Sequence, residues 1–343
     1  MTAQLRISRA RLAQNIASVR ARVAPAEVMV VVKDDAYGHG VETVASVARE
    51  GGVSWLGAID LPSALRAKAA VGDAARVFCW LTLGAEETRT ALTAGLELGV
   101  GDAAYLERIA DAAAGTAVVH LKIDTGLHRN GVRPEQWHAF VGRAAELERA
   151  GRIRVAGIWS HISEASDEDD DVARAAFERA VAAAREAGLA PEVRHLAASA
   201  AGWAREEFRY DLVRFGAFVY GVRSADGPAL PGIVPVATLV APVVAVHGDE
   251  VEIGIGSLDG LPSSLAGVAG VGTPGGSRAL LRVALASSFV AAWPGAAVGD
   301  EVAVWGDGAR GESSSTTLAE AIGTVGEEPL LRLSPLIPRV VVD

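Results

Sequence analysis

Eight short apolar runs alternate with segments of helical periodicity along the first two thirds of the chain. Most of these runs are rich in Val, Ile and Leu on both faces, which is typical of strands buried in a parallel sheet. Eight strands with regular helical crossovers predict a (β/α)8 barrel, or TIM barrel. The alternative is an open doubly wound sheet, which usually has a GxGxxG turn after its first strand, and this chain has none there. The predicted strands are residues 28–32, 54–60, 76–81, 96–100, 117–123, 154–162, 193–199 and 213–221.

The character of the sequence changes after the last of these strands. The remainder consists of short Val, Ile and Leu runs separated by Gly, Pro and Asp, which indicates an all-β domain. We therefore predict a barrel over residues 11–225 and a C-terminal β domain over residues 232–343. Residues 1–10 alternate partly and are expected to join the β domain as an edge strand. Two glycine-rich segments are predicted to be mobile loops, residues 267–276 and 306–311.

Composition excludes several classes of partner. The formal net charge is −10, which argues against a nucleic-acid partner because a phosphate backbone attracts basic proteins. Neither a signal peptide nor an 18-residue apolar span is present, so we expect a cytoplasmic protein that is not bound to a membrane. The single cysteine, Cys79, excludes an intrachain disulfide and is expected in the core. The acidic run at 167–171 has no histidine pattern beside it, so we predict a helix start and no metal site.

Lys33 is the first candidate for chemistry. It ends the first predicted barrel strand, and barrels place their chemistry at the carboxyl ends of their strands. Only three of the 32 basic residues are lysines, so lysine is not the default cation here. A lysine amine can form a Schiff base with a carbonyl compound, which arginine cannot do. The alternative is a lysine whose stem lies along the strand end while its charge reaches water.

Five motifs in order resemble the alanine racemase family. They are VVVKDDAYGHG around Lys33, HLKIDTGLHRNGV (120–132), GIWSHISEAS (157–166), RHLAASAAG (194–202) and RFGAFVYG (214–221). The resemblance implies an N-terminal barrel, a C-terminal β domain and the cofactor pyridoxal 5′-phosphate (PLP). It also implies an amino-acid substrate, with alanine as the default, and a homodimer whose active sites are shared between subunits.

The resemblance also implies roles for residues of the barrel. Lys33 would bind the cofactor covalently and would remove and return one α-proton. Tyr37, Ser199 and the backbone of Gly216 would bind the phosphate, and His161, at the end of the sixth strand, would pack on the cofactor ring. The alternatives are that Tyr37 is a buried structural residue, that Ser199 only caps its helix and that His161 is a core histidine with its own hydrogen-bond partners.

Three basic residues complete the implied site. Arg214 would face the pyridine nitrogen, and because arginine stays protonated, it would keep that nitrogen unprotonated and weaken the ring as an electron sink. Arg129 resembles the arginine that contacts the ring hydroxyl. Lys122 resembles the lysine that positions this arginine, in some members as a carbamate. Otherwise Arg129 and Lys122 are charges on the barrel rim.

The chain departs from the family pattern in the β domain. Racemisation needs proton delivery on both faces of the α-carbon, and in the family a tyrosine of the partner subunit's β domain serves the second face. All four tyrosines of this chain lie at or before Tyr220. Ser257 stands where the family has a tyrosine, and Glu327 lies near the position of a missing tail tyrosine. The chain is also shorter than the family pattern between residues 240 and 256. Ser257 and His128, beside Arg129, are the candidates for a substitute acid or base.

Three functions remain open at this point. The first is an amino-acid racemase with low or altered activity. The second is a different PLP-dependent reaction that uses Lys33 as its only base. The third is a PLP-binding homologue without catalytic activity. Exchange of a substrate α-proton separates the first two from the third.

Overall fold

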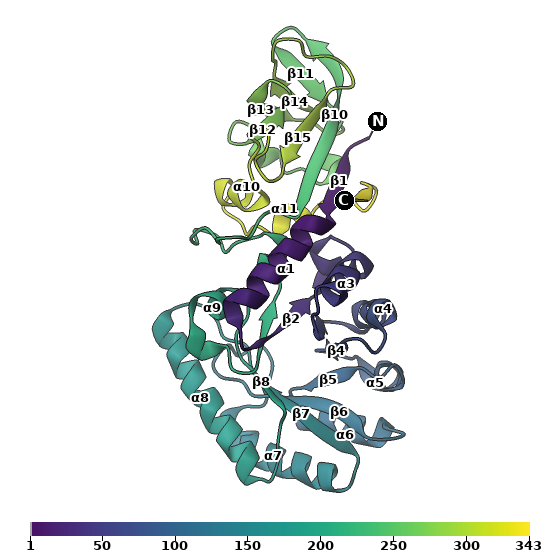
Figure 1. The fold of residues 1–343 in the computed structure, drawn as a ribbon, viewed down its shortest axis with the longest axis vertical. Coiled ribbons are helices and arrows are strands. Elements are labelled where there is room, and N and C mark those ends of the chain that lie inside the picture. Colours follow the sequence, from purple (N-terminus) through teal and green to yellow (C-terminus); the bar gives the residue numbers. More distant parts are fainter. Residues whose placement is uncertain (1) are drawn as a thin grey trace. The chain divides into compact units, whose positions relative to one another are not determined.

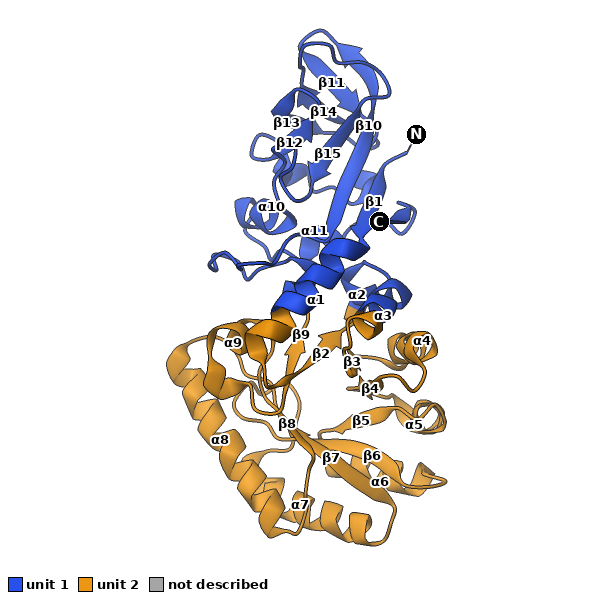
Figure 2. Ribbon diagram, viewed as in Figure 1, with its two compact units in different colours: residues 1–18, 34–47, 217–343 blue, residues 19–33, 48–216 orange. Residues whose placement is uncertain are grey.

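The computed structural model describes residues 2–343, which divide into two compact units (Figure 2). The barrel unit comprises residues 19–33 and 48–216. The β unit comprises residues 2–18, 34–47 and 217–343. The domain boundaries drawn from the sequence stay a prediction.

The barrel unit contains one parallel sheet of eight strands in the order β8-β7-β6-β5-β4-β3-β2-β9. The ring closes between its outer strands, where the N–H of Asp211 donates to the carbonyl of Arg194 and the N–H of Arg214 donates to that of Ala197, both at 3.2 Å. The predicted (β/α)8 barrel is therefore confirmed. Its strands are β2 (Glu27–Val31), β3 (Trp55–Ala58), β4 (Arg76–Cys79), β5 (Glu97–Val100), β6 (Ala117–Lys122), β7 (Ile153–Trp159), β8 (Val193–His195) and β9 (Leu212–Phe215).

Helices connect the barrel strands, and α4 to α8 lie on the outside of the ring (Figure 1). Several start at a side-chain cap: Asp60 accepts from the N–H of Ser63, and Asp102 from that of Tyr105. Ser166 caps α8, so the acidic run at 167–171 begins a helix as predicted. The helices are α4 (Leu61–Val71), α5 (Gly84–Thr93), α6 (Ala103–Ala112), α7 (Pro134–Arg149), α8 (Asp167–Glu186), α9 (Ser199–Ala204) and the 3₁₀ helix η1 (Glu206–Phe208); α1 (Arg9–Val23), α2 (Lys33–Tyr37) and α3 (Val41–Glu50) have residues in both units.

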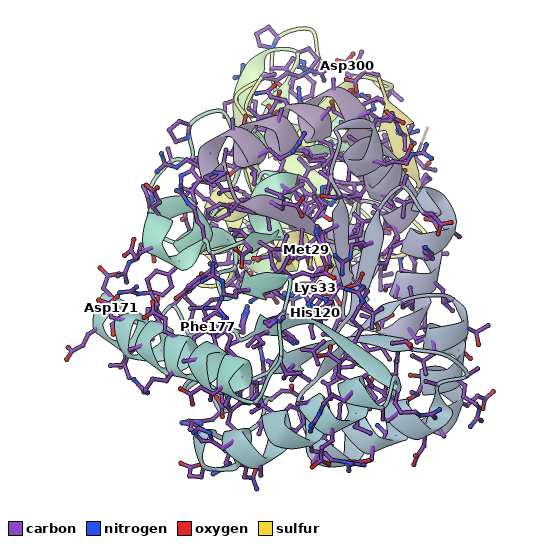
Figure 3. All side chains as sticks on the ribbon, turned by 60° about the horizontal axis from the view of Figure 1, so that its bottom comes forward. Met29, Lys33, His120, Asp171, Phe177 and Asp300 are labelled. Carbon is purple, nitrogen blue, oxygen red and sulfur yellow. The ribbon has the colours of Figure 1, made fainter. Side chains whose placement is uncertain are left out.

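The inside of the barrel is packed with large side chains. Its apolar cluster consists of Met29, Trp55, Phe78, Trp159 and Leu212, each at most 5% exposed (Met29 is labelled in Figure 3). Because side chains alternate between the two faces of a strand, every second residue of these strands points inward. Cys79 faces the other way and is fully buried, so its predicted place in the core is confirmed.

The β unit is built on an eight-stranded sheet in the order β11-β14-β13-β12-β15-β10-β1-β16, with a further pairing of β10 to β11. Strand β1 pairs with β10 on one side and with β16 on the other, so the prediction of an edge strand for residues 1–10 was wrong. The strands are β1 (Gln4–Ser8), β10 (Ala237–His247), β11 (Glu250–Ile253), β12 (Gly270–Thr273), β13 (Gly276–Val283), β14 (Ser288–Ala291), β15 (Glu301–Trp305) and β16 (Arg339–Val342). The helices are α10 (Ser315–Ala321), α11 (Glu328–Leu331), η2 (Ala217–Tyr220), η3 (Ser257–Asp259) and η4 (Ser263–Leu265).

The two glycine-rich segments differ. Residues 267–276 contain strand β12 and the turn into β13, so the prediction of a mobile loop there was wrong. Gly272 on β12 leaves room for neighbouring side chains, because a Cβ at this position would lie 2.5 Å from the Glu312 carboxylate. Residues 306–311 form a turn outside the regular elements, and their mobility stays a prediction.

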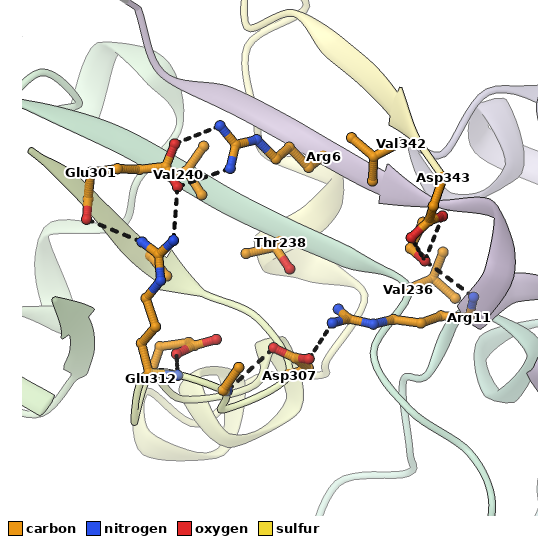
Figure 4. A pocket seen from close by; sticks show the side chains of 14 residues that line it. Arg6, Arg11, Val236, Thr238, Val240, Glu301, Asp307, Glu312, Val342 and Asp343 are labelled. Carbon is orange, nitrogen blue, oxygen red and sulfur yellow. Dashed lines mark hydrogen bonds and ion pairs between the residues drawn. The ribbon is translucent and has the colours of Figure 1, made fainter. Parts of the chain in front are cut away.

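The β unit also has a cavity of about 210 Å³ beside β1 and β15 (Figure 4). The three arginines that line it are paired with carboxylates: Arg6 and Arg310 with Glu301, and Arg11 with Asp307. The cavity therefore presents little unpaired charge to a ligand. Among residues 2–343, no helix combines the length and apolar character that crossing a membrane requires.

Candidate active site

Lys33 follows β2 at a strained turn. The N–H of Val32 still bonds across the sheet to the carbonyl of Gly57 at 2.8 Å, and α2 begins directly after it. Within α2, Asp34, Asp35, Ala36 and Tyr37 have φ between 52° and 55°, so the chain makes a left-handed turn. Such a conformation costs roughly 1–2 kcal/mol for each residue with a side chain, which is why it is concentrated at functional sites.

Arg214 on β9 is the most firmly held cation of the barrel. Its side chain is buried, and its two terminal nitrogens donate to the carbonyls of His195, Ser160 and Leu196 at 2.8–2.9 Å. Burial lowers the pKa of Arg214 to about 9, and the nearby Arg129 acts in the same direction. The guanidinium is still protonated at neutral pH and cannot turn, because its acceptors fix the plane of the group.

His161 lies beside Arg214, whose NH2 group is 3.0 Å from its Nδ1. Burial lowers the pKa of His161 to about 2, and the charges of Arg214, Arg129, Lys122 and Lys33 contribute in that order. The ring is therefore neutral and accepts a hydrogen bond at Nδ1. The structure thus brings five residues predicted from the sequence into one cluster.

One detail of the prediction for His161 was wrong. Strand β7 ends at Trp159, so His161 stands in the loop after the strand and not at its last position. The pairing of the sheet runs up to residue 160, where the N–H of Ser160 bonds to the carbonyl of His195 on β8, next to the bond from the N–H of Ile123 to the carbonyl of Trp159.

Lys122 lies at the end of β6 in the same cluster. Burial lowers the pKa of Lys122 to about 8, and Arg214 and Arg129 repel its charge further. Its ammonium lies 4.5 Å from the ring centre of Trp159, and the Arg214 guanidinium carbon lies 5.4 Å from the same ring. Both buried cations therefore lie within cation–π distance of the same indole. Trp159 was not singled out from the sequence, because an apolar strand residue carries no signal of this kind.

Ser199 and Gly216 meet at the start of α9. The N–H of Gly216 donates to the Ser199 hydroxyl at 3.1 Å. The N-cap of α9 is Ala198, with no side-chain cap, so the alternative in which Ser199 only caps its helix is wrong. Glu164 accepts from the N–H of Ala201 at 3.0 Å in the first turn of this helix. The hydroxyl and N–H pair predicted to bind phosphate is therefore assembled.

Tyr37 belongs to the β unit. Its buried ring lies 4.8 Å from that of Tyr220, on which His39 stacks at 4.7 Å. Burial raises the pKa of Tyr37, and the charges of Glu327 and Asp34 raise it further. The hydroxyl therefore stays protonated at neutral pH. Glu327, which stands near the position of the missing tail tyrosine, is thus close to Tyr37 within this unit.

The candidates for a second proton carrier are exposed. His128 is 77% exposed, and its Nδ1 lies 3.0 Å from the carboxylate of Asp124, which also accepts from its backbone N–H. Ser257 is exposed in η3. Strands β10 and β11 pair up to His247 and Glu250, so only a two-residue turn joins them. A tight hairpin therefore stands where the sequence is shorter than the family pattern.

A family model described as alanine racemase, N-terminal domain, matches residues 7–224. The alanine racemase of Thermobifida fusca is 35% identical over an alignment that covers 98% of this chain and 97% of that protein. This chain belongs to the alanine racemase family. The alanine racemase of Beutenbergia cavernae is similar, at 36% identity with 96% and 95% coverage.

Solved structures agree with this assignment of the family. Alanine racemase from Streptomyces coelicolor A3(2) superimposes with a TM-score of 0.94 at 32% identity, and covers 100% of this chain and 98% of that one. The enzyme from Streptomyces lavendulae has a TM-score of 0.92 at 32% identity, with 100% and 97% coverage. The alignment with the Thermobifida protein spans 365 positions and is longer than the 343 residues of this chain. The relative therefore has insertions that this family member lacks, in keeping with the short hairpin between β10 and β11.

Proposed function

We propose that this family member is a PLP-dependent racemase that interconverts L- and D-amino acids, with alanine as its default substrate. The observation that carries the proposal is the cationic cluster of the barrel. NH2 of Arg214 lies 3.0 Å from the neutral ring of His161, and Lys33, Lys122 and Arg129 lie near enough to lower the pKa of that ring. Four cations within a chain of net charge −10 indicate an anionic ligand. Two carboxylates lie nearby, Asp124 and Glu164, and the four cations outnumber them.

The residues of the barrel fit PLP in chemical type. PLP has a phosphate, an acidic ring hydroxyl, a pyridine nitrogen and an aldehyde. The Ser199 hydroxyl and Gly216 N–H suit the phosphate, and the family assigns Tyr37 to the same role. Arg129 suits the ring hydroxyl. Backbone carbonyls hold the terminal nitrogens of Arg214, so its Nε–H is the donor that suits an unprotonated ring nitrogen. Lys33 has the amine that condenses with an aldehyde.

When bound, PLP supplies the electron sink that acidifies the α-hydrogen of an amino acid. Lys33 would take this proton from the α-carbon on one face and return it. Arg214, held by three carbonyls, would donate to the ring nitrogen without transferring a proton, which limits the chemistry to proton exchange. His161 would pack on the ring as a neutral group, and Lys122 would hold Arg129 in place.

The test follows deuterium and chirality together. The PLP-loaded protein is incubated with L-alanine in heavy water, and α-deuterium and the D-isomer are measured over time. A racemase incorporates deuterium at the same rate at which chirality is lost. Lys33→Ala is expected to abolish both and to remove the absorbance of covalently bound PLP. An unchanged absorbance spectrum in this variant would refute the assignment of Lys33.

A second function is favoured by the tight β10–β11 hairpin and by the lack of any tyrosine after residue 220. With Lys33 as its only base, the protein would exchange the α-hydrogen on one face and retain chirality. Deuterium without racemisation would support this reaction. The racemase, by contrast, needs a base on the second face of the α-carbon, and His128 is the candidate because Asp124 orients its ring. If the protein is such a racemase, His128→Gln is expected to abolish racemisation and to leave one-sided exchange by Lys33 intact.

The remaining predictions concern the state of the protein. A homodimer with shared active sites is expected from the family and is tested by sedimentation of the PLP-loaded protein. A cytoplasmic location is tested by cell fractionation. If the protein binds PLP and exchanges no α-proton of any amino acid, it is a non-catalytic PLP-binding homologue.

A further inference from the structure

A chain of buried hydrogen bonds crosses the inside of the barrel and ends at Arg214. NH1 of Arg214 lies 3.2 Å from Nδ1 of His195, and Nε2 of His195 lies 2.9 Å from Nδ1 of His120. Nε2 of His120 lies 2.8 Å from the carboxylate of Glu97. Both histidines are completely buried (His120 is labelled in Figure 3). The motifs that contain these histidines were noted in the sequence, but neither they nor Glu97 received a role.

Glu97 determines the direction of this chain. Arg76 donates to both of its carboxylate oxygens, one of them at 2.9 Å. Burial raises the pKa of Glu97, but hydrogen bonds from His120 and Arg76 outweigh burial and leave that pKa lowered. Glu97 is therefore an anion that only accepts hydrogen bonds. Burial also lowers the pKa of both His120 and His195, so each ring is neutral and has one N–H.

The tautomers then follow one from another. Because Glu97 accepts, Nε2 of His120 carries the proton and its Nδ1 is a bare acceptor. His195 must therefore donate from Nε2, which leaves its own Nδ1 bare. Arg214, which has no acceptor, finds this bare nitrogen in place. If the order were reversed, an N–H of His195 would face an N–H of Arg214 inside the barrel, at a cost of about 1–3 kcal/mol for each unsatisfied buried group.

The surrounding structure is shaped for this arrangement. A Cβ at Gly157 on β7 would lie 2.2 Å from Nδ1 of His120, so only glycine leaves space for the ring. Phe78 packs on both imidazoles, with ring centres 4.6 Å from His120 and 5.4 Å from His195. Trp159 stacks parallel to His195 at 5.6 Å. Neither imidazole can turn to exchange its nitrogens without displacing these rings.

We propose that Glu97 and His120 are positioning residues that act through His195 to keep Arg214 a fixed hydrogen-bond donor toward the cofactor. The proposal rests on the proposed function for the role of Arg214. Glu97 stands three hydrogen bonds away from Arg214, at the far end of β5. The negative charge of Glu97 makes each unprotonated histidine nitrogen in this series of hydrogen bonds a stronger acceptor. An outer carboxylate fixes the tautomer of a catalytic or metal-bound histidine in a similar way. A network that only filled the core would need no fixed direction.

The test compares Glu97→Gln with Glu192→Gln. Glu192 is the matched control because it is the other carboxylate paired with Arg76, at 2.9 Å from NH1, and has no contact with His120 among the described residues. Protein with ¹⁵N-labelled histidine and no cofactor is examined by NMR, which distinguishes bare from protonated ring nitrogens. Wild type and Glu192→Gln are expected to have a bare Nδ1 in both His120 and His195. In Glu97→Gln the amide also has donors, so His195 is expected to gain a protonated Nδ1 population.

The second readout uses PLP-loaded protein. Glu97→Gln is expected to change the absorbance spectrum of the bound cofactor and to slow racemisation about tenfold to a hundredfold, the usual effect of an outer partner of a histidine. Glu192→Gln is expected to leave both unchanged. If Glu97→Gln does not fold, Arg76→Gln combined with Glu97→Gln removes both charges together and takes its place.

The outcomes separate this proposal from the proposed function. An unchanged His195 tautomer in Glu97→Gln overturns the claim that Glu97 sets the direction. A changed tautomer with an unchanged cofactor spectrum and an unchanged rate overturns the positioning role. If wild type binds PLP but racemises no amino acid, the proposed function fails. The histidine tautomers and the cofactor spectrum of the variants then still support or overturn the positioning of Arg214.

Discussion

His161 makes the stability of the cofactor-free protein depend on pH in the mildly acid range. Its pKa is 6.5 in an unfolded chain and about 2 in the folded barrel, mainly because of burial. Below pH 6.5 the unfolded state therefore binds a proton that the folded state does not, so the free energy of unfolding falls as the pH falls. At pH 5.0 the loss from His161 is about 2 kcal/mol relative to neutral pH.

Other buried histidines act in the same direction. The pKa of His39 is lowered to about 4 by burial, which adds another loss of about 2 kcal/mol at pH 5.0. Burial also lowers the pKa values of His120 and His195. A small domain has only about 5–15 kcal/mol of stability, so wild type is expected to be strongly destabilised near pH 5.

The assay is urea unfolding of cofactor-free protein at pH 7.5 and pH 5.0, followed by tryptophan fluorescence. His161→Asn keeps an acceptor for Arg214 and removes the titrating ring. This variant is expected to lose about 2 kcal/mol less than wild type between the two pH values. The control is His138→Gln, on the exposed side of α7, which should lose as much as wild type. Equal losses in His161→Asn and wild type would show that the ring is not held neutral by the barrel.

Three further substitutions test the packing and charge of the barrel. Burial lowers the pKa of Lys122 from 10.5 to about 8, so its ammonium destabilises the folded state. Lys122→Met is therefore expected to raise the free energy of unfolding at pH 7 by up to about 3 kcal/mol. Urea unfolding measures this, with Lys68→Met at the surface as the control; a loss of stability in Lys122→Met would contradict the sign. Gly157→Ala places a Cβ against His120 and is expected to cost about 1–3 kcal/mol. The control is Gly142→Ala on α7, where the added Cβ meets no atom within 4 Å and should stabilise the protein by about 0.5–1 kcal/mol. Equal melting temperatures for Gly157→Ala and Gly142→Ala would refute the close contact at Gly157.

Local periodicity was enough to predict the barrel. Each of the eight strands lies where an apolar run was found, because a strand buried on both faces needs apolar side chains at every position. Single residues with special chemistry were also visible: Lys33 at a strand end and the absence of tyrosine after residue 220 are properties of the sequence alone.

The errors arose where pairing partners come from distant parts of the chain. Strand β1 (Gln4–Ser8) is an inner strand because β16, more than 300 residues later, covers its open edge. The glycine-rich segment at 267–276 pairs as β12 because β13 and β15 offer it partners on both sides. No local pattern reveals such pairing, since a strand is an edge only if nothing else completes the sheet.

The hydrogen-bond chain through the barrel was decided by the tertiary structure alone. Glu97, His120 and His195 lie on three different strands, and nothing in the local sequence links any one of them to the other two. Only closure of the barrel brings them within 3 Å of one another, and only burial makes the direction of their hydrogen bonds matter. In water each group would find its own partner. Inside the barrel no water competes, so one carboxylate can govern an arginine three hydrogen bonds away.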